Sequence, residues 1–384
     1  MKLFFETWSN LGKFKKQTSD KRRLVVYSEG QQDWPHMGPM IEEFLRQNPH
    51  EHVSYLSSGK NDPGLMYKHE RFHSFSIGSG TARTAFFRSL DAKLLLMSLP
   101  DLNIYHLKKS MLPVHYVYCF HSINSSHTAY RTHAFEHYDT IFCVGPHHIQ
   151  ELRKEEVLKK IKPRQLLEHG SVKFDTILKA YEKHRGSPVS ETPFILLAPT
   201  WGDSSYIKNP AWLKQIVVNL TSRKLVCRLR LHPMTIRHQP ELIPGMRVEF
   251  SKLIEQDLFE IEDNMNDNSS LLEAAVMISD WSGAATEFAF GLERPVLFID
   301  TPQKINNSKW NLFETRGIED FIRDQIGTIL QVHQLDEVAD RVLDLIENKD
   351  EYAEKIRKSR KEWIFNSGQS ASIGAKHLSV LLLK

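Results

Sequence analysis

The sequence predicts an α/β protein made of two doubly wound parallel-sheet domains, and three observations support this prediction. Short apolar segments alternate with amphipathic helical patterns from residue 22 onward, which is typical of parallel sheets covered by helices. The alternation is interrupted at 186–193, where Pro, Ser and Gly accumulate as in a linker, and it then restarts. With 384 residues, the chain is long enough to bury a core in each of two domains.

The first domain is expected to cover residues 23–187. Its predicted strands are the apolar runs RLVVYSEG, HVSYLSSG, SFSIG, KLLLMSLP, VHYVYCFHS and DTIFCVG, with a shorter run near Leu166. Helices are predicted where apolar residues recur at spacings of three and four: at 38–47, after Gly80, at 147–161 and at 176–185.

The second domain is expected to cover residues 194–334. Strands are predicted at 194–201, 224–233, 246–251, 276–283 and 295–300. Helices are predicted at 210–222, 269–275 and 284–292. Residues 335–384 are expected to form C-terminal helices, with 376–384 suited to either a helix or a strand. Both domains are therefore predicted to be Rossmann-like.

The composition excludes a fibrous or largely disordered chain, because 41% of the residues are hydrophobic and 25% are charged. No apolar run approaches the ~18 residues of a membrane span, and the first residues lack the apolar block and cleavage site of a signal peptide. A cytoplasmic protein is therefore expected. Cys119, Cys143 and Cys227 lie in apolar runs without CxxC spacing, which favours reduced, structural thiols.

The positive charge is concentrated at the N-terminus. Residues 1–23 hold seven basic and two acidic residues, a net +5, so the chain's net charge of +3 leaves −2 for the remainder. Because the residues after 23 carry no net positive charge, electrostatics gives no reason to expect binding to nucleic acid. Residues 1–22 also show apolar side chains at helical spacing, which predicts a basic amphipathic helix. That helix is expected either to lie on an anionic membrane surface or to pack on its own domain.

Polar residues at the carboxyl ends of strands are the candidates for function, because open parallel sheets bind ligands there, and two such domains favour a cleft between them. In the first domain a predicted strand ends at His121, which is followed by Ser122, Asn124 and Ser125. A histidine can remove a hydroxyl proton near neutral pH, and the hydroxyls and turn amides can hold an anion. A helix N-cap cluster is the alternative, and it explains residues 124–126 well, but it does not require His121.

In the second domain a buried strand is predicted to end at Asp280, before a tight turn at Ser282 and Gly283 and a helix beginning near Ala285. Helix N-termini present unpaired N–H groups and a partial positive charge, and Gly lets a phosphate approach the backbone. The pattern therefore predicts a phosphate cradle, with plain capping of a buried helix as the alternative.

Further polar residues follow other strands. His232 precedes a proline at a strand end, and Arg230 lies on the same strand, where it could meet a phosphate. Thr200 follows the first strand of the second domain, and His169 and Ser171 follow a strand of the first. We interpret His232, with His121, as a catalytic candidate and the other four as candidates for substrate binding. A satisfied turn histidine and a solvated arginine remain alternatives at His232 and Arg230.

Several common catalytic motifs are absent: the sequence has no GxxxxGK[ST] loop, no GxSxG elbow and no GxGxxG after the first strand. His133 and His137 bracket an HxxEH string, as in inverted zinc proteases. A strand is predicted directly after it, which leaves little helix to carry such a site. We therefore interpret these histidines as packing or surface groups and predict no metal site.

Several segments together resemble the CDP-glycerol glycerophosphotransferase family, which builds teichoic-acid and related polyol-phosphate polymers. The matching segments, in order along the chain, are FHSINSSH, VGPHH, HGSVKFD, APTW, RLHP and ISDWSGAATEFAFGLERPVLFID. They span roughly residues 110–300. The resemblance implies a two-domain GT-B architecture in which the second domain holds most of the nucleotide.

The resemblance also implies site roles. His121 corresponds to the family's base, His232 to the histidine that engages the donor diphosphate, and Asp280 and Ser282 to the aspartate and serine of its D-Y-S-S signature. The sequence departs from the family at Ser122, where the family has glycine in H-G-T, and at Trp281 and Gly283 in the signature. The activity implied is transfer of glycerol or ribitol phosphate from a CDP-linked donor to a glycan or lipid-linked hydroxyl, with release of CMP and without a cofactor.

Two alternative functions remain open at this point. The chain could be a glycosyltransferase of the same architecture that uses a nucleotide sugar in surface polysaccharide synthesis. It could also be a non-catalytic subunit that binds a nucleotide sugar and docks an assembly complex on the membrane. Neither the acceptor nor the oligomeric state follows from the sequence.

Overall fold

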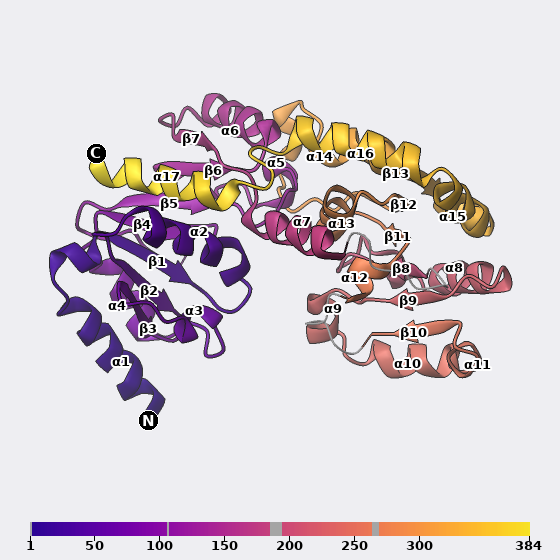
Figure 1. Cartoon of the computed structure of the whole chain (residues 1–384), viewed down its shortest axis with the longest axis horizontal. Coiled ribbons are helices and arrows are strands. Elements are labelled where there is room, and N and C mark those ends of the chain that lie inside the picture. The colour runs from indigo at the N-terminus through magenta and orange to yellow at the C-terminus, as the bar shows by residue number, and fades with distance from the viewer. Residues whose placement is uncertain (1, 106, 185–193, 263–268) are drawn as a thin grey trace. The chain divides into compact units, whose positions relative to one another are not determined.

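The computed structural model describes residues 2–105, 107–184, 194–262 and 269–384. The chain forms two compact units. Unit 1 consists of Met1–Thr176, Asn306–Thr315 and Trp363–Lys384, and unit 2 of Ile177–Ile305 and Arg316–Glu362. Figure 1 shows the strands of each unit flanked by helices.

Unit 1 is built on a seven-stranded parallel sheet with the strand order β3-β2-β1-β4-β5-β6-β7. Its strands are β1 (Leu24–Ser28), β2 (Val53–Ser57), β3 (Phe72–Ser76), β4 (Leu94–Met97), β5 (His115–Cys119), β6 (Thr140–Cys143) and β7 (Gln165–Glu168). The helices that begin in this unit are α1 (Lys2–Lys15), η1 (Ser19–Arg22), α2 (Trp34–Gln47), α3 (Pro63–Met66), α4 (Thr81–Arg88), α5 (Ser126–Ala129), α6 (Pro146–Lys159), α7 (Val172–His184), η3 (Trp310–Phe313) and α17 (Ser370–Leu383).

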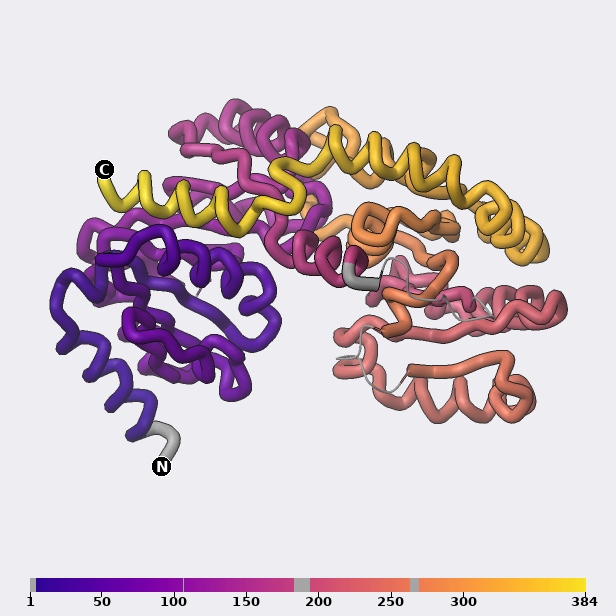
Figure 2. The backbone as a smooth tube through the Cα atoms, viewed as in Figure 1, coloured from indigo at the N-terminus to yellow at the C-terminus, as the bar shows by residue number. Residues whose placement is uncertain are grey.

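The order of this sheet reverses between β1 and β4, since the chain runs from β1 outward through β2 and β3 before it returns to β4. A crevice forms at the carboxyl ends of strands at such a reversal, and ligands of doubly wound sheets bind there. Both strands are completely buried, as expected for apolar runs covered on two faces. Helices α2 and α17 pack side by side in this unit, as Figure 2 shows, so the end of the chain completes the unit's core.

Unit 2 contains a six-stranded parallel sheet in the order β10-β9-β8-β11-β12-β13. The strands are β8 (Ile195–Leu197), β9 (Cys227–Leu229), β10 (Phe259–Ile261), β11 (Val276–Ser279), β12 (Val296–Asp300) and β13 (Gly327–Gln331). The helices are η2 (Tyr206–Lys208), α8 (Pro210–Ser222), α9 (Pro233–His238), α10 (Leu242–Glu249), α11 (Ser251–Glu255), α12 (Ser269–Glu273), α13 (Gly283–Leu292), α14 (Ile318–Ile326), η4 (Val332–Glu337), α15 (Val338–Glu347) and α16 (Lys349–Trp363).

The predicted fold class, with two doubly wound parallel sheets and a helical C-terminal region, is confirmed. One predicted strand is wrong: residues 246–249 lie in α10 and Ser251 begins α11, with Phe250 as the turn between the two helices. The reason is that Ile243, Met246, Phe250 and Leu253 recur at helical spacing and pack on the core of unit 2, while Val248 between them is exposed. The segment 376–384, open between helix and strand, lies in α17 apart from its last residue.

The chain crosses between the units more often than one linker would require. The linker predicted at 186–193 lies outside the described residues. Helix α7 starts in unit 1 and ends in unit 2, Asn306–Thr315 belongs to unit 1, and the C-terminal helices are shared, with α17 in unit 1. Each unit is therefore assembled from segments that are distant in the sequence.

The N-terminal helix packs on unit 1 through its second half. Leu11 and Phe14 are buried, and the Phe14 ring contacts Phe75 and Phe86 with centroids 5.8 Å away in each case. Phe5 and Trp8 remain 65% and 39% exposed. The N-terminal helix therefore packs on its own domain, as one of the two alternatives predicted. This packing leaves Phe5 and Trp8 at the surface.

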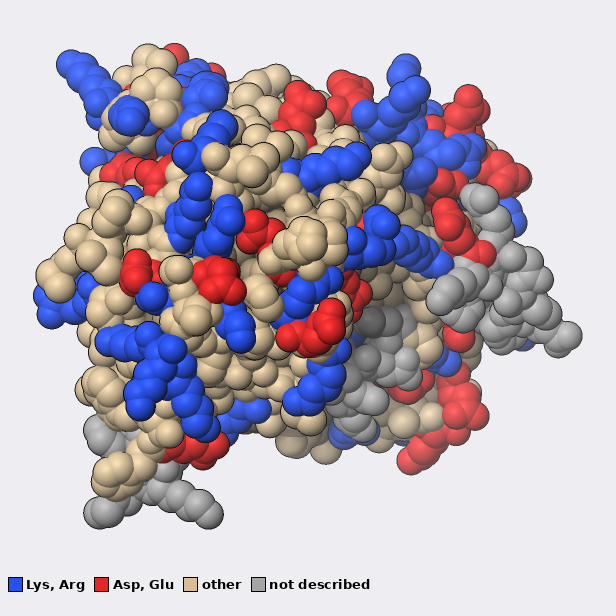
Figure 3. Space-filling view, turned by 60° about the vertical axis from the view of Figure 1, so that its left-hand side comes forward, with Lys and Arg blue, Asp and Glu red and all other residues tan. Residues whose placement is uncertain are grey.

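Charges of both signs lie at the surface. In the view of Figure 3, acidic side chains are interspersed with basic ones over the face of the molecule that is shown. No helix among the described residues is both long and apolar enough to cross a membrane.

Candidate functional site

His121 lies just beyond the carboxyl end of β5 in unit 1, where a neighbouring strand fixes its tautomer. Its Nδ1 atom is 3.1 Å from the carbonyl oxygen of Ser98, which follows β4, so Nδ1–H donates a hydrogen bond to that oxygen. The Ser98 hydroxyl in turn donates to Asp33 Oδ1 at 3.0 Å. Because a neutral imidazole carries one proton, Nε2 is left as a proton acceptor.

Two tyrosines flank this imidazole. The Tyr130 hydroxyl is 3.4 Å from Nε2 of His121, and the Tyr118 hydroxyl is 3.4 Å from Nδ1. Burial raises the pKa of both phenols, so both keep their protons near neutral pH. Tyr130 therefore acts as a donor toward Nε2, at a distance long enough for a substrate hydroxyl to replace it.

The residues after His121 form a compact turn. The Ser122 hydroxyl donates to Asn124 Oδ1 and accepts from the Asn124 N–H, both at 3.1 Å, and both residues are half-buried. Ser125 is the N-cap residue of α5 and is completely buried, although its side chain makes no cap hydrogen bond. Ser122 and Asn124 are thus engaged with one another in the turn, and Ser125 occupies the N-cap position that the capping alternative expected without the side-chain hydrogen bond of a cap.

Helix α6 supports this turn with a buried polar face. His147 and His148 place their Nε2 atoms 2.8 and 2.9 Å from the carbonyl oxygens of Ile123 and Asn124. The carboxylate of Glu151 accepts hydrogen bonds from the backbone N–H and the hydroxyl of Ser126 and from the N–H of His127. The turn that carries His121 is therefore held by two histidines of the matching segment VGPHH and by Glu151, which the sequence pattern did not single out.

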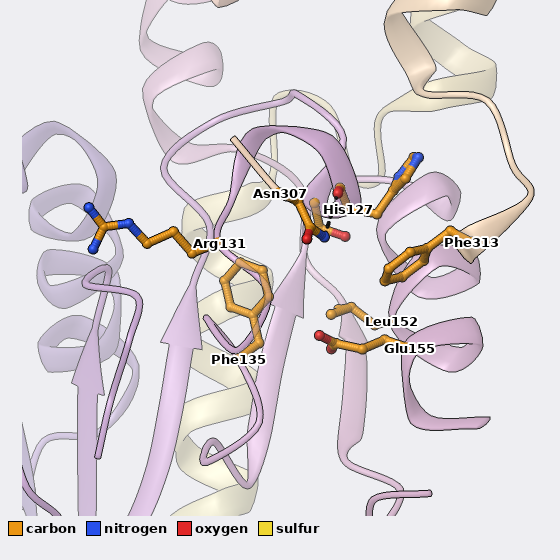
Figure 4. A pocket seen from close by; sticks show the side chains of 8 residues that line it. His127, Arg131, Phe135, Leu152, Glu155, Asn307 and Phe313 are labelled. Atoms are coloured by element: carbon orange, nitrogen blue, oxygen red, sulfur yellow. Dashed lines mark hydrogen bonds between the residues drawn. The ribbon is translucent and has the colours of Figure 1, made fainter. Parts of the chain in front are cut away.

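The segment 306–315 adds a second support. Asn307, 3% exposed, donates from Nδ2 to the carbonyl oxygen of His127 and accepts at Oδ1 from the Thr132 hydroxyl. The ring of Phe313 lies 5.2 Å from that of His127. Asn307, His127 and Phe313 line a cavity of about 10 Å³, the space for one water molecule. Figure 4 shows Asn307 and His127 next to one another, with Arg131 directed away from them.

The structure does not bring His169 and Ser171 to this site. His169 is 1% exposed, and its ring packs on Phe142 beneath Gly374 of α17. Burial lowers its pKa to about 3, so it is neutral. Ser171 is also buried, and its hydroxyl accepts from the Phe174 N–H at the start of α7. His169 therefore has a packing role, and Ser171 caps the start of α7.

Residues 132–137 form turns rather than a helix. His133 lies 2.8 Å from Glu136 and is exposed. Over the described part of the chain, no three His, Cys, Asp or Glu side chains are grouped so as to hold a metal ion.

In unit 2, Asp280 is a buried carboxylate at the end of β11. It accepts hydrogen bonds from the N–H groups of Thr200 and Tyr206 at 2.8 and 3.2 Å. Burial raises its pKa to about 6, against the lowering effect of these N–H donors and of Lys304. Asp280 therefore holds the turn after β8 in place, and it is 1% exposed. This geometry assigns it a positioning role for Thr200 rather than direct contact with a ligand.

Lys304, Trp201 and His232 gather beside this turn. The Lys304 ammonium lies 4.3 Å from the centroid of the Trp201 ring and 3.1 Å from the Trp201 carbonyl oxygen. The His232 ring lies 6.2 Å from that of Trp201. His232 Nδ1 accepts from the Met234 N–H at the start of α9, so the neutral ring carries its proton on Nε2 and can donate it to a ligand.

Ser282 and Gly283 lie where the pattern predicted a phosphate cradle. Ser282 is the N-cap residue of α13, and its hydroxyl accepts from the Ala284 N–H at 3.3 Å. Gly283 is the first helical residue, and both residues are half-buried. Trp281 anchors the turn through a hydrogen bond from its indole N–H to the Thr301 carbonyl oxygen. Ser282 therefore caps α13, as the alternative to a phosphate cradle expected. The N-terminus of this helix is also accessible, and its N–H groups suit an anion.

Arg230 is engaged within unit 2. Its guanidinium lies 2.8 Å from Glu262 Oε2 and 3.3 Å from the Ser270 hydroxyl. The positive charge of Arg230, which the sequence suggested could meet a phosphate, is thus balanced by the carboxylate of Glu262 at the end of the neighbouring strand. Through this ion pair, Arg230 can hold in place the strand end that carries His232, two residues further along the chain.

Sequence reasoning missed several members of both clusters. Lys304 lies beyond β12 in the motif-free segment TPQK, and Ser98, Asp33 and Glu151 carry no recognisable motif. Ser98 offered one weak signal, because it directly follows an apolar run that resembles a parallel strand. The contacts that give these residues their roles join segments that are distant in sequence.

The two clusters are chemically distinct. One sheet carries an oriented imidazole with a proton-accepting nitrogen, and the other carries a helix N-terminus beside an imidazole N–H and an ammonium. These are the parts that a nucleotide-dependent transferase requires: a base for an acceptor hydroxyl and donors for a diphosphate.

The family model for CDP-glycerol:poly(glycerophosphate) glycerophosphotransferases matches residues 124–373, well over half of the chain. The chain therefore belongs to this family, and it is an enzyme that transfers a polyol phosphate from a CDP-linked donor to a cell-surface glycan. His121 lies three residues before the matched segment. A search of curated proteins found no match.

Solved structures of low sequence identity share the fold. The wall teichoic acid polymerase TagF superposes with a TM-score of 0.61 at 15% identity, covering 99% of this chain and 94% of that one. The UDP-GlcNAc 2-epimerase of Methanocaldococcus jannaschii gives 0.58 at 14% identity, covering 94% and 100%. A glycosyltransferase from Rickettsia africae gives 0.56 at 12%, covering 95% and 99%. The GT-B-like architecture implied by the sequence is confirmed.

Proposed function

We propose that the chain moves glycerol phosphate or ribitol phosphate from its CDP-linked donor to a hydroxyl of a glycan or lipid-linked acceptor, with His121 as the base. The observation that supports this role is the hydrogen bond from His121 Nδ1–H to the Ser98 carbonyl oxygen. Because that bond fixes the tautomer, Nε2 is available to take the acceptor's proton.

The reaction is a phosphoryl transfer. The acceptor oxygen attacks the phosphorus that bears the polyol, a new P–O bond forms, and the bond from this phosphorus to the bridging oxygen of the diphosphate breaks. The acceptor proton passes to His121 Nε2, and CMP leaves with the bridging oxygen. Since little covalent chemistry falls to the protein, its contribution is positioning and the stabilisation of charge.

The donor diphosphate is assigned to unit 2. His232 Nε2–H and the N–H groups at the start of α13, beside Ser282 and Gly283, would donate to its oxygens. Lys304, half-buried beside Trp201, would offset the negative charge. Thr200, Asp280 and Arg230 would hold this arrangement, through the hydrogen bonds described above.

A donor panel tests the proposal. We expect CDP-glycerol or CDP-ribitol to yield free CMP when an acceptor is supplied, and CDP compounds to raise the unfolding temperature more than UDP compounds do. Release of nucleotide from a nucleotide sugar alone would support the glycosyltransferase alternative. CDP binding without turnover of any donor would favour a non-catalytic subunit, and either outcome contradicts the proposal.

We further propose that the protein is cytoplasmic and meets its acceptor at the inner face of the membrane through α1. Phe5 and Trp8 are exposed on this helix, and Lys13, Lys15 and Lys16 are exposed near its C-terminal end. Aromatic rings beside basic side chains suit the boundary of an anionic bilayer.

Vesicle flotation tests this contact. The full chain is expected to float with vesicles of phosphatidylglycerol and phosphatidylcholine and to remain unbound with phosphatidylcholine alone. A Phe5→Ala/Trp8→Ala variant should bind about tenfold more weakly. Trp310→Ala, which removes another exposed tryptophan of unit 1, serves as the control. Equal binding by the double variant and the unaltered protein would refute the role of α1.

A further inference from the structure

A buried arginine packs beside the turn that leads into α13. Arg323 lies on α14 in unit 2, and its side chain is 6% exposed. The central carbon of its guanidinium lies 4.2 Å from the centroid of the Trp281 ring and 5.1 Å from that of the Phe298 ring on β12. The guanidinium therefore packs against both rings, and the attraction of a cation for an aromatic face is strongest where water is excluded.

Two further contacts fix the orientation of this guanidinium. Its Nη1 atom donates a hydrogen bond to Asp300 Oδ1 at 3.0 Å, and Asp300 Oδ2 accepts from the side-chain amide of Gln331 at 2.9 Å. Asp300 and Gln331 are paired residues at the ends of β12 and β13. Because both belong to the sheet, and β12 also pairs with β11, they hold the guanidinium at a fixed place relative to the turn after β11.

The Trp281 ring is thus held at two points. Its indole N–H donates to the Thr301 carbonyl oxygen at 2.7 Å, and the Arg323 guanidinium packs against the ring. Trp281 directly precedes Ser282 and Gly283, where the chain turns into α13, and all three residues are half-buried. N–H donors stabilise an anion most when their direction is fixed before the ligand arrives, so a fixed Trp281 favours binding at the N-terminus of α13.

Packing alone accounts poorly for Arg323. Its Nε and Nη2 atoms are buried and make no hydrogen bond to any residue that the structure describes. Burial of a charge with some of its hydrogen bonds unmade lowers stability, and an apolar side chain of similar size would fill the same space without this penalty. Arg228 shows the ordinary case, because it also packs on a ring, that of Phe194, but it is 32% exposed and pairs with Glu260. A residue that lowers stability is expected where the fold serves a site.

We propose that Arg323 is a positioning residue for the donor diphosphate and acts through Trp281, an inference that rests on the proposed function. The guanidinium holds the indole ring, and the ring fixes the turn at Ser282 and Gly283. The N–H groups of that turn then point toward the phosphate oxygens of the donor. Arg323 does not touch the nucleotide, so its effect is expected in donor binding rather than in the proton transfer at His121.

Titration with CDP tests this role at equilibrium. By isothermal titration of the full chain, we expect Arg323→Met to bind CDP about tenfold more weakly, because a misaligned turn loses about one charge-assisted hydrogen bond. Arg323→Lys keeps a cation and should retain part of the affinity. Trp281→Leu should weaken CDP binding by a similar factor. In the double variant the two effects should not add, since Arg323 acts only through the Trp281 ring.

Initial rates separate this role from a general loss of stability. In Arg323→Met the KM for the CDP-linked polyol should rise about tenfold while kcat changes by less than about threefold, since binding is lost and the base is kept. Arg341→Met is the control, because it removes an exposed arginine of unit 2 that pairs with Glu337, and it should change neither constant. Thermal unfolding checks the folding of each variant. Asp300→Asn, which removes the charge that anchors the guanidinium, decides the matter if Arg323→Met does not fold.

The proposal is overturned if Arg323→Met or, should that variant not fold, Asp300→Asn binds CDP as tightly as the unaltered protein. It is also overturned if the unaltered protein does not bind CDP, or if the effects of Arg323→Met and Trp281→Leu add in full, because Arg323 would then act by another route. The proposed function fails in a different way, when the unaltered protein releases no CMP from either CDP-linked polyol. The CDP titrations require no turnover, so they decide the role of Arg323 in either case.

Discussion

Replacing His121 with alanine is expected to lower the rate of CMP release from a competent donor and acceptor pair by about a thousandfold. The variant loses the only group assigned to take the acceptor's proton, and general base catalysis contributes about 10²–10⁴ in rate. The fold should persist, because the side chain is half-buried, and the backbone carbonyl and two tyrosine hydroxyls that it contacts can be solvated. Initial rates at saturating donor measure the effect.

Two controls separate catalysis from binding in this experiment. Donor affinity, followed by the thermal shift with CDP, should be unchanged, since the diphosphate is assigned to unit 2. His133→Ala, an exposed histidine in the same unit, should keep the full rate. Turnover by His121→Ala within tenfold of the unaltered protein would show that another group removes the proton.

The fold class was predictable because its signal is local and repeated. Strands such as Leu24–Ser28 and Leu94–Met97 are buried on both faces, so they are continuous apolar runs, and amphipathic helices separate them. Residues 246–251 were predicted wrongly for the same reason, because a short run around Val248 suits a strand until Ile243 and Leu253 are included. The strand Phe259–Ile261 was missed, since three residues carry too little periodicity.

The site was predictable only where a strand end and a polar residue coincide. His121 and Ser282 lie just beyond the carboxyl ends of β5 and β11, as the predicted strand ends indicated. His169 shows the limit of this reasoning, because the helix that buries it, α17, comes from the end of the chain. Lys304 shows the converse, since its neighbour Trp201 is distant in sequence and no motif marks Lys304.

Helix α6 presents the clearest conflict between local pattern and structure. Charged residues along a helix usually mark a solvated face, yet Glu151 is 3% exposed. Its carboxylate accepts from two backbone N–H groups and one hydroxyl, and Oε1 is 3.2 Å from His127 Nδ1. Burial would raise the pKa of this carboxyl, but His127 and the neighbouring imidazoles hold it at about 2.

The sign of the pH effect follows from this lowered pKa. A carboxyl that is more acidic in the folded state than in the unfolded chain stabilises the fold fully above its ordinary pKa of 4.5. That stabilisation is lost as the pH falls from 4.5 toward 2. A difference of this size corresponds to about 3 kcal/mol.

Glu151→Gln should therefore lower the free energy of opening the His121 turn by about 3 kcal/mol at pH 7, because two backbone N–H donors and His127 lose their ionised partner. Hydrogen exchange at the Ser126 and His127 amides measures this opening locally. The difference from the unaltered protein should shrink as the pH is lowered through 4.5 toward 2, since Glu151 then becomes neutral as well.

The matched control for this prediction is Glu70→Gln, which neutralises a carboxylate of the same unit whose side chain is 83% exposed. It should change exchange at these amides little, because an exposed pair contributes about 0–1 kcal/mol. If Glu151→Gln behaves like this control, the turn that carries His121 is held by the imidazoles of His147 and His148 and by Asn307 rather than by the carboxylate.

The rate of CMP release by Glu151→Gln is a second measurement of the same support. If the carboxylate holds the turn, its loss misplaces Nε2 of His121 and lowers this rate while the variant remains folded. If the imidazoles and Asn307 hold the turn, the rate should be unchanged.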